Sequence, residues 1–106
     1  MAISGGGVLN LETKNATKSA GTNVLSVTDL THKPKIMLFV YSASYYYYYW
    51  NESNPNVMEY YTNNGVHDSA YDVTGTFTVT DTSFETPSFL WSSASINVKA
   101  ISIYEE

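Results

Sequence analysis

The sequence contains no cysteine, arginine or glutamine, and these absences exclude whole classes of protein. Without cysteine there is neither a disulfide framework nor a cysteine-based zinc site, so the 106 residues must fold around a hydrophobic core alone. Five lysines stand against ten acidic residues, which gives a net charge of -5 and a pI near 4.8. Too few cations are present to neutralise a row of phosphates, and arginine cannot read bases here. We therefore expect no nucleic-acid partner.

Long apolar runs are missing as well. The longest, at residues 36–41, is far shorter than the ~20 residues that cross a bilayer. No positively charged and then apolar segment opens the sequence, so no signal peptide is visible and we expect no membrane insertion. Residues 1–7 include three consecutive glycines and predict a flexible lead-in. Residues 8–106 predict one domain.

Strong helix formers are sparse, whereas strand formers gather in short runs between turn residues. Residues 8–12 and 23–28 are predicted strands, and the polar stretch at 13–22 is a predicted loop. Residues 35–50 predict a strand whose first, continuously apolar part is covered on both faces. Sixteen residues exceed the usual strand length, so we expect a bulge, bend or break at 42–44.

Turn residues at 51–56 predict a hairpin in which residues 57–62 return antiparallel to residues 45–50. Residues 74–80 alternate threonine with apolar residues, as a half-buried strand does. Turn residues at 63–65 and the polar stretch that follows them, up to residue 72, predict a loop before that strand.

The last quarter of the chain predicts a loop at 84–87 with one buried anchor, a short strand at 88–92 and a closing strand at 96–104. The apolar residues of the closing strand change parity after Ala100, so either both faces are buried or a bulge near Ala100 changes the register. About seven short strands at 8–12-residue spacing predict an all-β fold. We expect a single antiparallel β-sandwich, jelly-roll-like or Ig-like.

No motif for catalysis or cofactor binding is present. There is no nucleophile elbow, no phosphate loop and no H-E-x-x-H or EF-hand spacing, so we expect no enzyme, no cofactor and no metal site. His67, Asp68 and Asp72 could form an oxygen-rich site, but we interpret them as exposed loop residues. A small hydrolase would instead require two carboxylates about 5–10 Å apart in a pocket.

Tyrosine, in contrast, is abundant, and most of the ten tyrosines fall in one predicted hairpin. Residues 45–50 are five tyrosines and a tryptophan, opposed across the turn by two further tyrosines. In an extended strand Tyr45, Tyr47 and Tyr49 point to one side and the intervening residues to the other. The core of a small domain can cover one row, so the other row must face water, a neighbouring chain or a ligand.

Three interpretations of the aromatic hairpin remain open: packing in the core or at a sheet edge, an interface, and a sugar-binding platform. Tyrosine suits an interface because it combines apolar area with a hydrogen-bonding tip. A pyranose could stack on the rings while asparagine side chains bind its hydroxyls. The candidate ligand or interface residues are Tyr45, Tyr47, Tyr49, Trp50, Tyr60, Tyr61, Asn51 and Asn54.

Two stretches resemble small β-domains at the tips of bacteriophage tail fibres and appendages, and of related prophage proteins. In residues 27–40, Lys33-Pro34-Lys35 leads into an apolar strand, as K-P-K or T-P-K does in those domains. In residues 74–85 a polar strand precedes a turn of the D-x-G-F kind, and the chain ends in a similar closing strand. The sequence departs from the pattern at 30–32, where a Gly-aromatic pair is common, and at Ser83, where glycine is common.

The resemblance implies a non-catalytic structural or binding domain of a phage or prophage tail appendage that contacts a host-surface receptor. It also implies a homo-oligomer, with a trimer favoured, located in the virion or outside the cell. It transfers no catalytic residue. The alternative is a carbohydrate-binding module of a secreted or cell-surface protein, which would bind a cell-surface glycan on its aromatic platform.

Overall fold

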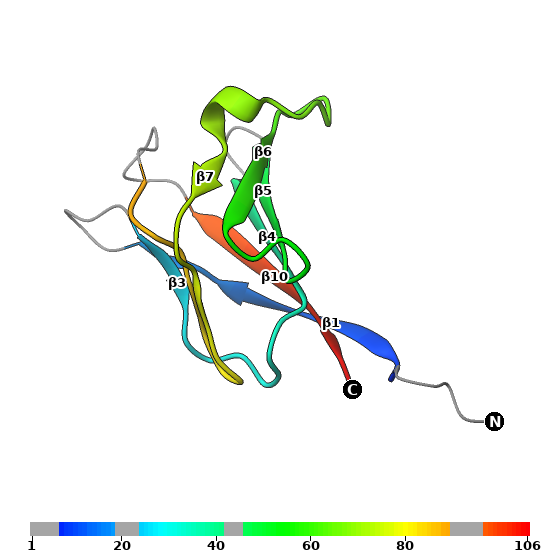
Figure 1. Cartoon of the computed structure of the whole chain (residues 1–106). Helices are drawn as coiled ribbons and strands as arrows, with labels where there is room; N and C mark the ends of the chain where they lie inside the picture. The colour runs from blue at the N-terminus through cyan, green and yellow to red at the C-terminus, as the bar shows by residue number, and fades with distance from the viewer. Residues whose placement is uncertain (1–6, 19–23, 42–45, 90–96) are drawn as a thin grey trace.

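The chain folds into a β-sandwich of two antiparallel sheets, as the sequence predicts (Figure 1). The structure is a computed structural model, and it describes residues 7–18, 24–41, 46–89 and 97–106. The larger sheet contains, in spatial order, β1 (Leu9–Asn15), β10 (Val98–Glu105), β4 (Ile36–Tyr41), β5 (Tyr46–Asn51), β6 (Val57–Tyr61) and β7 (Val73–Thr74). The smaller sheet contains β2 (Thr17–Lys18), β3 (Leu25–Val27), β9 (Phe84–Glu85) and β8 (Thr78–Val79).

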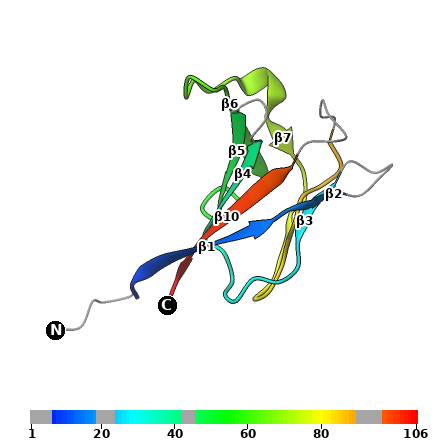
Figure 2. The ribbon, with the colours of Figure 1, turned by 180° about the vertical axis from the view of Figure 1, so that it is seen from behind.

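The longest strands all belong to the larger sheet. β1 runs beside β10 for its whole length and leads into β2, which pairs with β3 in the smaller sheet (Figure 2). The ten strands of the described residues exceed the predicted number of about seven, because several of those in the smaller sheet have only two residues. One turn of 3₁₀ helix, η1 (Ser69–Tyr71), follows β6. No helix within the described ranges is long and apolar enough to span a membrane.

An aromatic core fills the space between the sheets. The Trp50 ring meets the Phe84 ring edge-on at 4.9 Å between centroids, and Phe39 lies 5.6 Å from Phe84. The indole Nε1 of Trp50 donates a hydrogen bond to the carbonyl oxygen of Pro55 at 3.0 Å, which satisfies its one polar atom. Trp50 and Phe84 therefore join the two sheets.

Strand alternation decides which residues reach this core. In β4 the buried residues are Met37, Phe39 and Tyr41, whereas the residues between them are half-exposed. The prediction that both faces of this strand are covered is therefore wrong, because the smaller sheet covers only one face. In β10 the strand is continuous and its pairing with β1 and β4 shows no bulge at Ala100. The isoleucines that follow Ala100 lie on the other, half-exposed face.

Two other predictions along the chain need correction. Residues 35–50 hold two strands instead of one, because β4 and β5 pair antiparallel as neighbours; residues 42–44, where a bulge, bend or break is predicted, lie outside the described residues. The predicted loop at 13–22 is wrong for the end of β1 and for β2, whose polar residues are strand residues at a solvent-facing edge.

The prediction of one strand at 74–80 is also wrong, because β7 and β8 belong to different sheets. Phe84 is fully buried and is the anchor expected in the predicted loop at 84–87, although Phe84–Glu85 is itself a strand. Of the predicted strand at 88–92, residues 88–89 are not in a strand and the rest lies outside the described ranges. Most of the predicted glycine lead-in lies outside them too.

Candidate functional site

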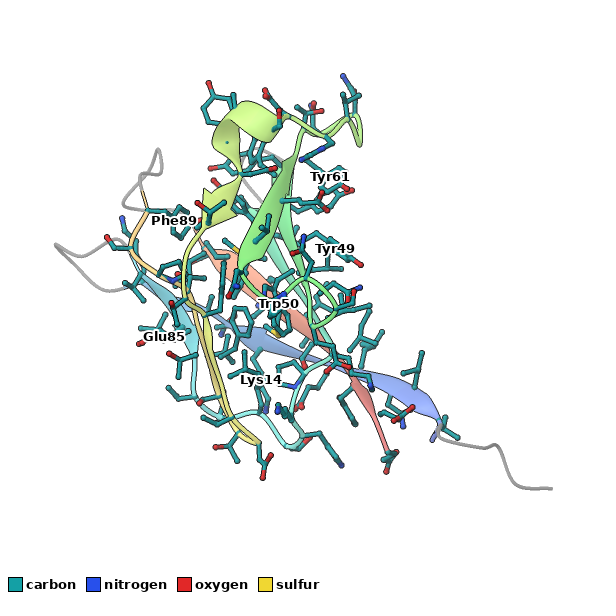
Figure 3. The ribbon with its side chains drawn as sticks, viewed as in Figure 1. Lys14, Tyr49, Trp50, Tyr61, Glu85 and Phe89 are labelled. Atoms are coloured by element: carbon teal, nitrogen blue, oxygen red, sulfur yellow. The ribbon has the colours of Figure 1, made fainter. Side chains whose placement is uncertain are left out.

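The aromatic hairpin has an inner and an outer row, as the strand period requires. Tyr48 and Trp50 face the smaller sheet and are buried, whereas Tyr47 and Tyr49 are on the opposite face and half-exposed. Tyr61 of β6 pairs with Tyr47 and shares its face. In Figure 3 the Tyr49 and Tyr61 side chains point away from the smaller sheet, while Trp50 lies between the layers.

An apolar groove runs along this outer face. We call it the aromatic groove; its volume is about 410 Å³, and it is lined by Leu38, Val40, Tyr47, Tyr49 and Tyr61. The pairing register places these residues side by side, because Leu38 pairs with Tyr49 and Val40 with Tyr47. Antiparallel pairing of β4, β5 and β6 is thus what builds the groove.

The tyrosine rings of the groove hold one another in place. Tyr47 and Tyr61 stack face to face, with centroids 5.1 Å apart and an interplanar angle of 6°. Tyr49 meets Tyr61 edge-on at 6.5 Å. Stacking occupies one face of each ring in the pair, and both rings line the groove.

A second, polar pocket adjoins the groove at Tyr49. This polar pocket has a volume of about 220 Å³ and is lined by Tyr49, Asn51, Ser53, Asn54, Val57 and Glu59. The Asn51 side chain is fixed there, because its Nδ2 donates to the Tyr49 hydroxyl at 2.7 Å and its Oδ1 accepts from the backbone N–H and hydroxyl of Ser53. A tyrosine hydroxyl that accepts one hydrogen bond can still donate another.

At the end of the groove, the Tyr61 phenol lies beside the Glu59 carboxylate. Partial burial and the nearby Glu59 carboxylate raise the pKa of the Tyr61 phenol. A phenol is protonated at neutral pH even at the usual pKa near 10, and the Tyr61 hydroxyl donates to Glu59 Oε1 at 3.4 Å. The surface thus combines neutral aromatic rings with a few fixed polar atoms.

The structure divides the predicted set of site residues. Tyr47, Tyr49, Tyr61, Asn51 and Asn54 line the two cavities.

Two predicted residues lie on the inner side instead. Trp50 is 1% exposed in the core, so its ring does not contribute to this surface. Tyr60 pairs with Tyr48 and packs on the inner side, between the rings of Tyr48 and Tyr71. Tyr45 lies outside the described residues.

Sequence reasoning missed the floor of the groove. Leu38 and Val40 belong to a continuously apolar run, which was interpreted as covered on both faces. Their parity relative to Tyr47 and Tyr49 would have identified them, had β4 and β5 been recognised as paired neighbours.

The structure keeps His67 and Asp72 of the predicted oxygen-rich group together and adds Glu59, which no local pattern joins to them. Glu59, His67 and Asp72 place their ligand atoms within 4.8 Å of one another, and we call them the His67 cluster. Asp68, which the sequence grouped with His67, instead accepts a hydrogen bond from the Ala70 N–H at the start of η1.

No protein-family model matches the chain, and neither does any curated protein or solved structure with which it was compared.

Proposed function

We propose that this chain is a non-catalytic binding domain, of the type carried by phage or prophage tail appendages, which assembles with identical copies through its outer face. The single observation behind this proposal is the aromatic groove, an apolar surface on one face of the larger sheet. Soluble monomers rarely leave contiguous apolar patches above a few hundred Å² exposed. A partner that covers this face would remove the free-energy cost of exposing its apolar side chains to water.

The apolar character extends beyond the groove over neighbouring strands. Ile36 on β4 and the isoleucines Ile101 and Ile103 on β10 share the outward parity of Leu38, and all are half-exposed. A standard interface buries about 800 Å² per partner. The whole chain exposes 6208 Å², so such an interface would use only about an eighth of its surface.

The groove is also ordered before any partner arrives. Binding usually costs side-chain entropy, because free rotamers become fixed. Tyr47, Tyr49 and Tyr61 already restrain one another through ring contacts, which lowers that cost. Tyrosine is moreover enriched at interface centres, where its ring adds apolar area and its hydroxyl finds a partner.

Light scattering coupled to size-exclusion chromatography tests the assembly. We expect a homotrimer of the 11.8 kDa chain between micromolar and millimolar concentrations. Leu38→Lys places a charge in the centre of the groove and should yield folded monomers. Val66→Lys is the matched control, since Val66 is an exposed aliphatic residue in the turn after β6.

Two outcomes would contradict assembly through this face. One is a wild-type chain that stays monomeric at millimolar concentration. The other is an oligomer whose mass Leu38→Lys leaves unchanged while the circular dichroism of that variant is native. Tail-assembly or baseplate genes beside the gene would support the phage setting independently.

A second candidate function is glycan binding, and the polar pocket favours it. Tyr49 belongs to both cavities, so a sugar stacked in the aromatic groove would have the fixed Asn51 and the exposed Asn54 beside it. A host-surface glycan is accordingly the receptor chemistry that this surface suits. The same site would serve a carbohydrate-binding module of a secreted protein.

A glycan array with purified variants tests the second candidate. Tyr47→Ala and Tyr49→Ala should each abolish binding, because ring contacts of this kind supply much of the affinity. Tyr71→Ala is the control, since Tyr71 is exposed but lies outside both cavities. A wild-type chain that binds no glycan, or binding that survives both groove variants, would exclude the platform.

A further inference from the structure

The His67 cluster gathers three metal-binding groups at the end of β6. His67 Nε2 lies 2.9 Å and 3.0 Å from the two carboxylate oxygens of Asp72, and 3.7 Å from Oε2 of Glu59. The three side chains come from β6, from the bridge residue after the turn and from the residue that ends η1. Because one imidazole nitrogen faces three carboxylate oxygens, the cluster differs from a simple ion pair.

The backbone holds the ligands of this cluster in position. His67 forms an antiparallel bridge with Tyr61, and the Asp68 N–H donates to the Tyr60 carbonyl oxygen at 3.0 Å. The Asp72 Oδ1 accepts from the Tyr60 N–H at 2.9 Å, which fixes the orientation of that carboxylate. Outer hydrogen bonds of this kind orient ligands in natural metal sites.

The distances and the ligand types match one class of cation. In a tetrahedral zinc site with bonds near 2.1 Å, ligand atoms lie about 3.4 Å apart. This value is between the 2.9 Å from His67 Nε2 to Asp72 and the 3.7 Å from His67 Nε2 to Glu59. We infer that Glu59, His67 and Asp72 bind one divalent transition-metal ion, with zinc as the preferred occupant. Calcium requires six to eight oxygen ligands, and a site with one imidazole and two carboxylates offers too few.

The net charge of the cluster also suits a divalent cation. Two carboxylates with a neutral imidazole carry a charge of -2, and a divalent cation neutralises it. The Glu59 and His67 side chains are each about one third exposed, so water can complete the coordination. The site also adjoins the groove, because the His67 ring packs on Tyr61 at 5.3 Å and Glu59 lines the polar pocket.

Isothermal titration calorimetry of the tag-free protein with zinc chloride tests this inference. We expect one zinc ion per chain and a melting temperature that rises by about 10 °C when zinc is present at a hundredfold excess over its Kd. His67→Phe keeps a ring against Tyr61 but removes the ligand nitrogen, and Glu59→Gln removes one charge. Each should weaken zinc binding at least ~10-fold.

The second histidine provides the matched control. His32 stacks on Tyr104 at 4.2 Å and bonds the Thr31 hydroxyl, so His32→Phe changes the same residue type in a comparable ring contact. That variant should bind zinc as the wild type does. Magnesium and calcium chloride should give no saturable heat.

A measurement on the wild-type chain covers the case in which a variant fails to fold. In NMR spectra of the imidazole nitrogens, zinc should shift the His67 signals and leave the His32 signals in place. Zinc binding that is not saturable, or equal effects on the two histidines, would overturn the site and leave His67 in an ion pair. The inference does not rest on the proposed function, since assembly and glycan binding are measured separately.

Discussion

At the scale of single residues, Tyr49 and Trp50 are adjacent in sequence and opposite in role. Trp50 is buried against Phe84, whereas Tyr49 lies on the outer face. Trp50→Ala should lower the free energy of unfolding by about 3–5 kcal/mol, because it removes a large core ring and leaves a cavity. Tyr49→Ala should cost less than about 1 kcal/mol in the isolated chain. Urea unfolding measures both values, and equal losses would contradict the division into inner and outer rows.

The buried phenols make stability depend on pH in the alkaline range. Burial, with neighbouring tyrosines as the lesser cause, raises the pKa of Tyr41 and Tyr48 far above the usual value near 10. The unfolded chain therefore loses these protons first, so the stability contributed by each phenol is intact below pH ~10 and falls by about 1.4 kcal/mol per unit above it.

Urea unfolding at a series of pH values checks this alkaline dependence. The wild type should lose stability steeply above pH ~10, and Tyr48→Phe should reduce the slope by about 1.4 kcal/mol per pH unit. Tyr71→Phe is a suitable control, because Tyr71 is 61% exposed. A slope that does not change in Tyr48→Phe would show that this phenol titrates normally.

At the scale of elements, the turn between β6 and the His67 bridge depends on Gly65. Gly65 has φ +76°, its N–H donates to the Thr62 carbonyl oxygen at 2.9 Å, and nothing lies within 4 Å of an added Cβ. Gly65→Ala should therefore cost about 1 kcal/mol through backbone strain alone, and Gly65→Asn less, because asparagine tolerates this conformation. Thermal unfolding measures both. A neutral Gly65→Ala would contradict the turn geometry.

Local patterns predicted the elements that turn residues bound most clearly. The hairpin of β5 and β6 is confirmed, since turn residues separate two strong strand formers. The polar residues of β1 and β2 were predicted as loop because edge strands open to water carry polar side chains. Thr74 and Thr78 appeared to share a strand because alternation does not reveal that the chain passes from one sheet to the other between them.

At the scale of the whole molecule, the site depends on pairings that no local pattern contains. The sequence can name the tyrosines as candidates, since any strand through 45–50 has an aromatic row on each face. Which row faces outward depends on the position of the smaller sheet, and that sheet is built from strands far apart in the chain. The His67 cluster depends likewise on a chain reversal after Tyr61, so spacing alone grouped His67 with Asp72 but could not add Glu59.

The unequal sheets predict an unequal distribution of stability. β10 is hydrogen-bonded on both sides, to β1 and to β4, and it buries Val98, Ala100 and Ser102 against the core. β8 has two residues at the edge of the smaller sheet, and among the described strands it pairs with β9 alone. Amides of β10 should therefore exchange hydrogen only on global unfolding, whereas those of β8 exchange through local opening.

Native-state hydrogen exchange followed by NMR measures this difference. We expect amides of β10 to be protected at least ~100-fold more strongly than those of β8. Mild denaturant should accelerate the exchange of the β10 amides far more than that of the β8 amides. Trp50→Ala should reduce the difference in protection between β10 and β8, because it removes the ring that joins the sheets at Phe84. Equal protection in the wild type would mean that both sheets open as one unit. With unequal protection, β10 stays paired with β4, the strand that provides Leu38 and Val40 of the aromatic groove, while the edge of the smaller sheet opens.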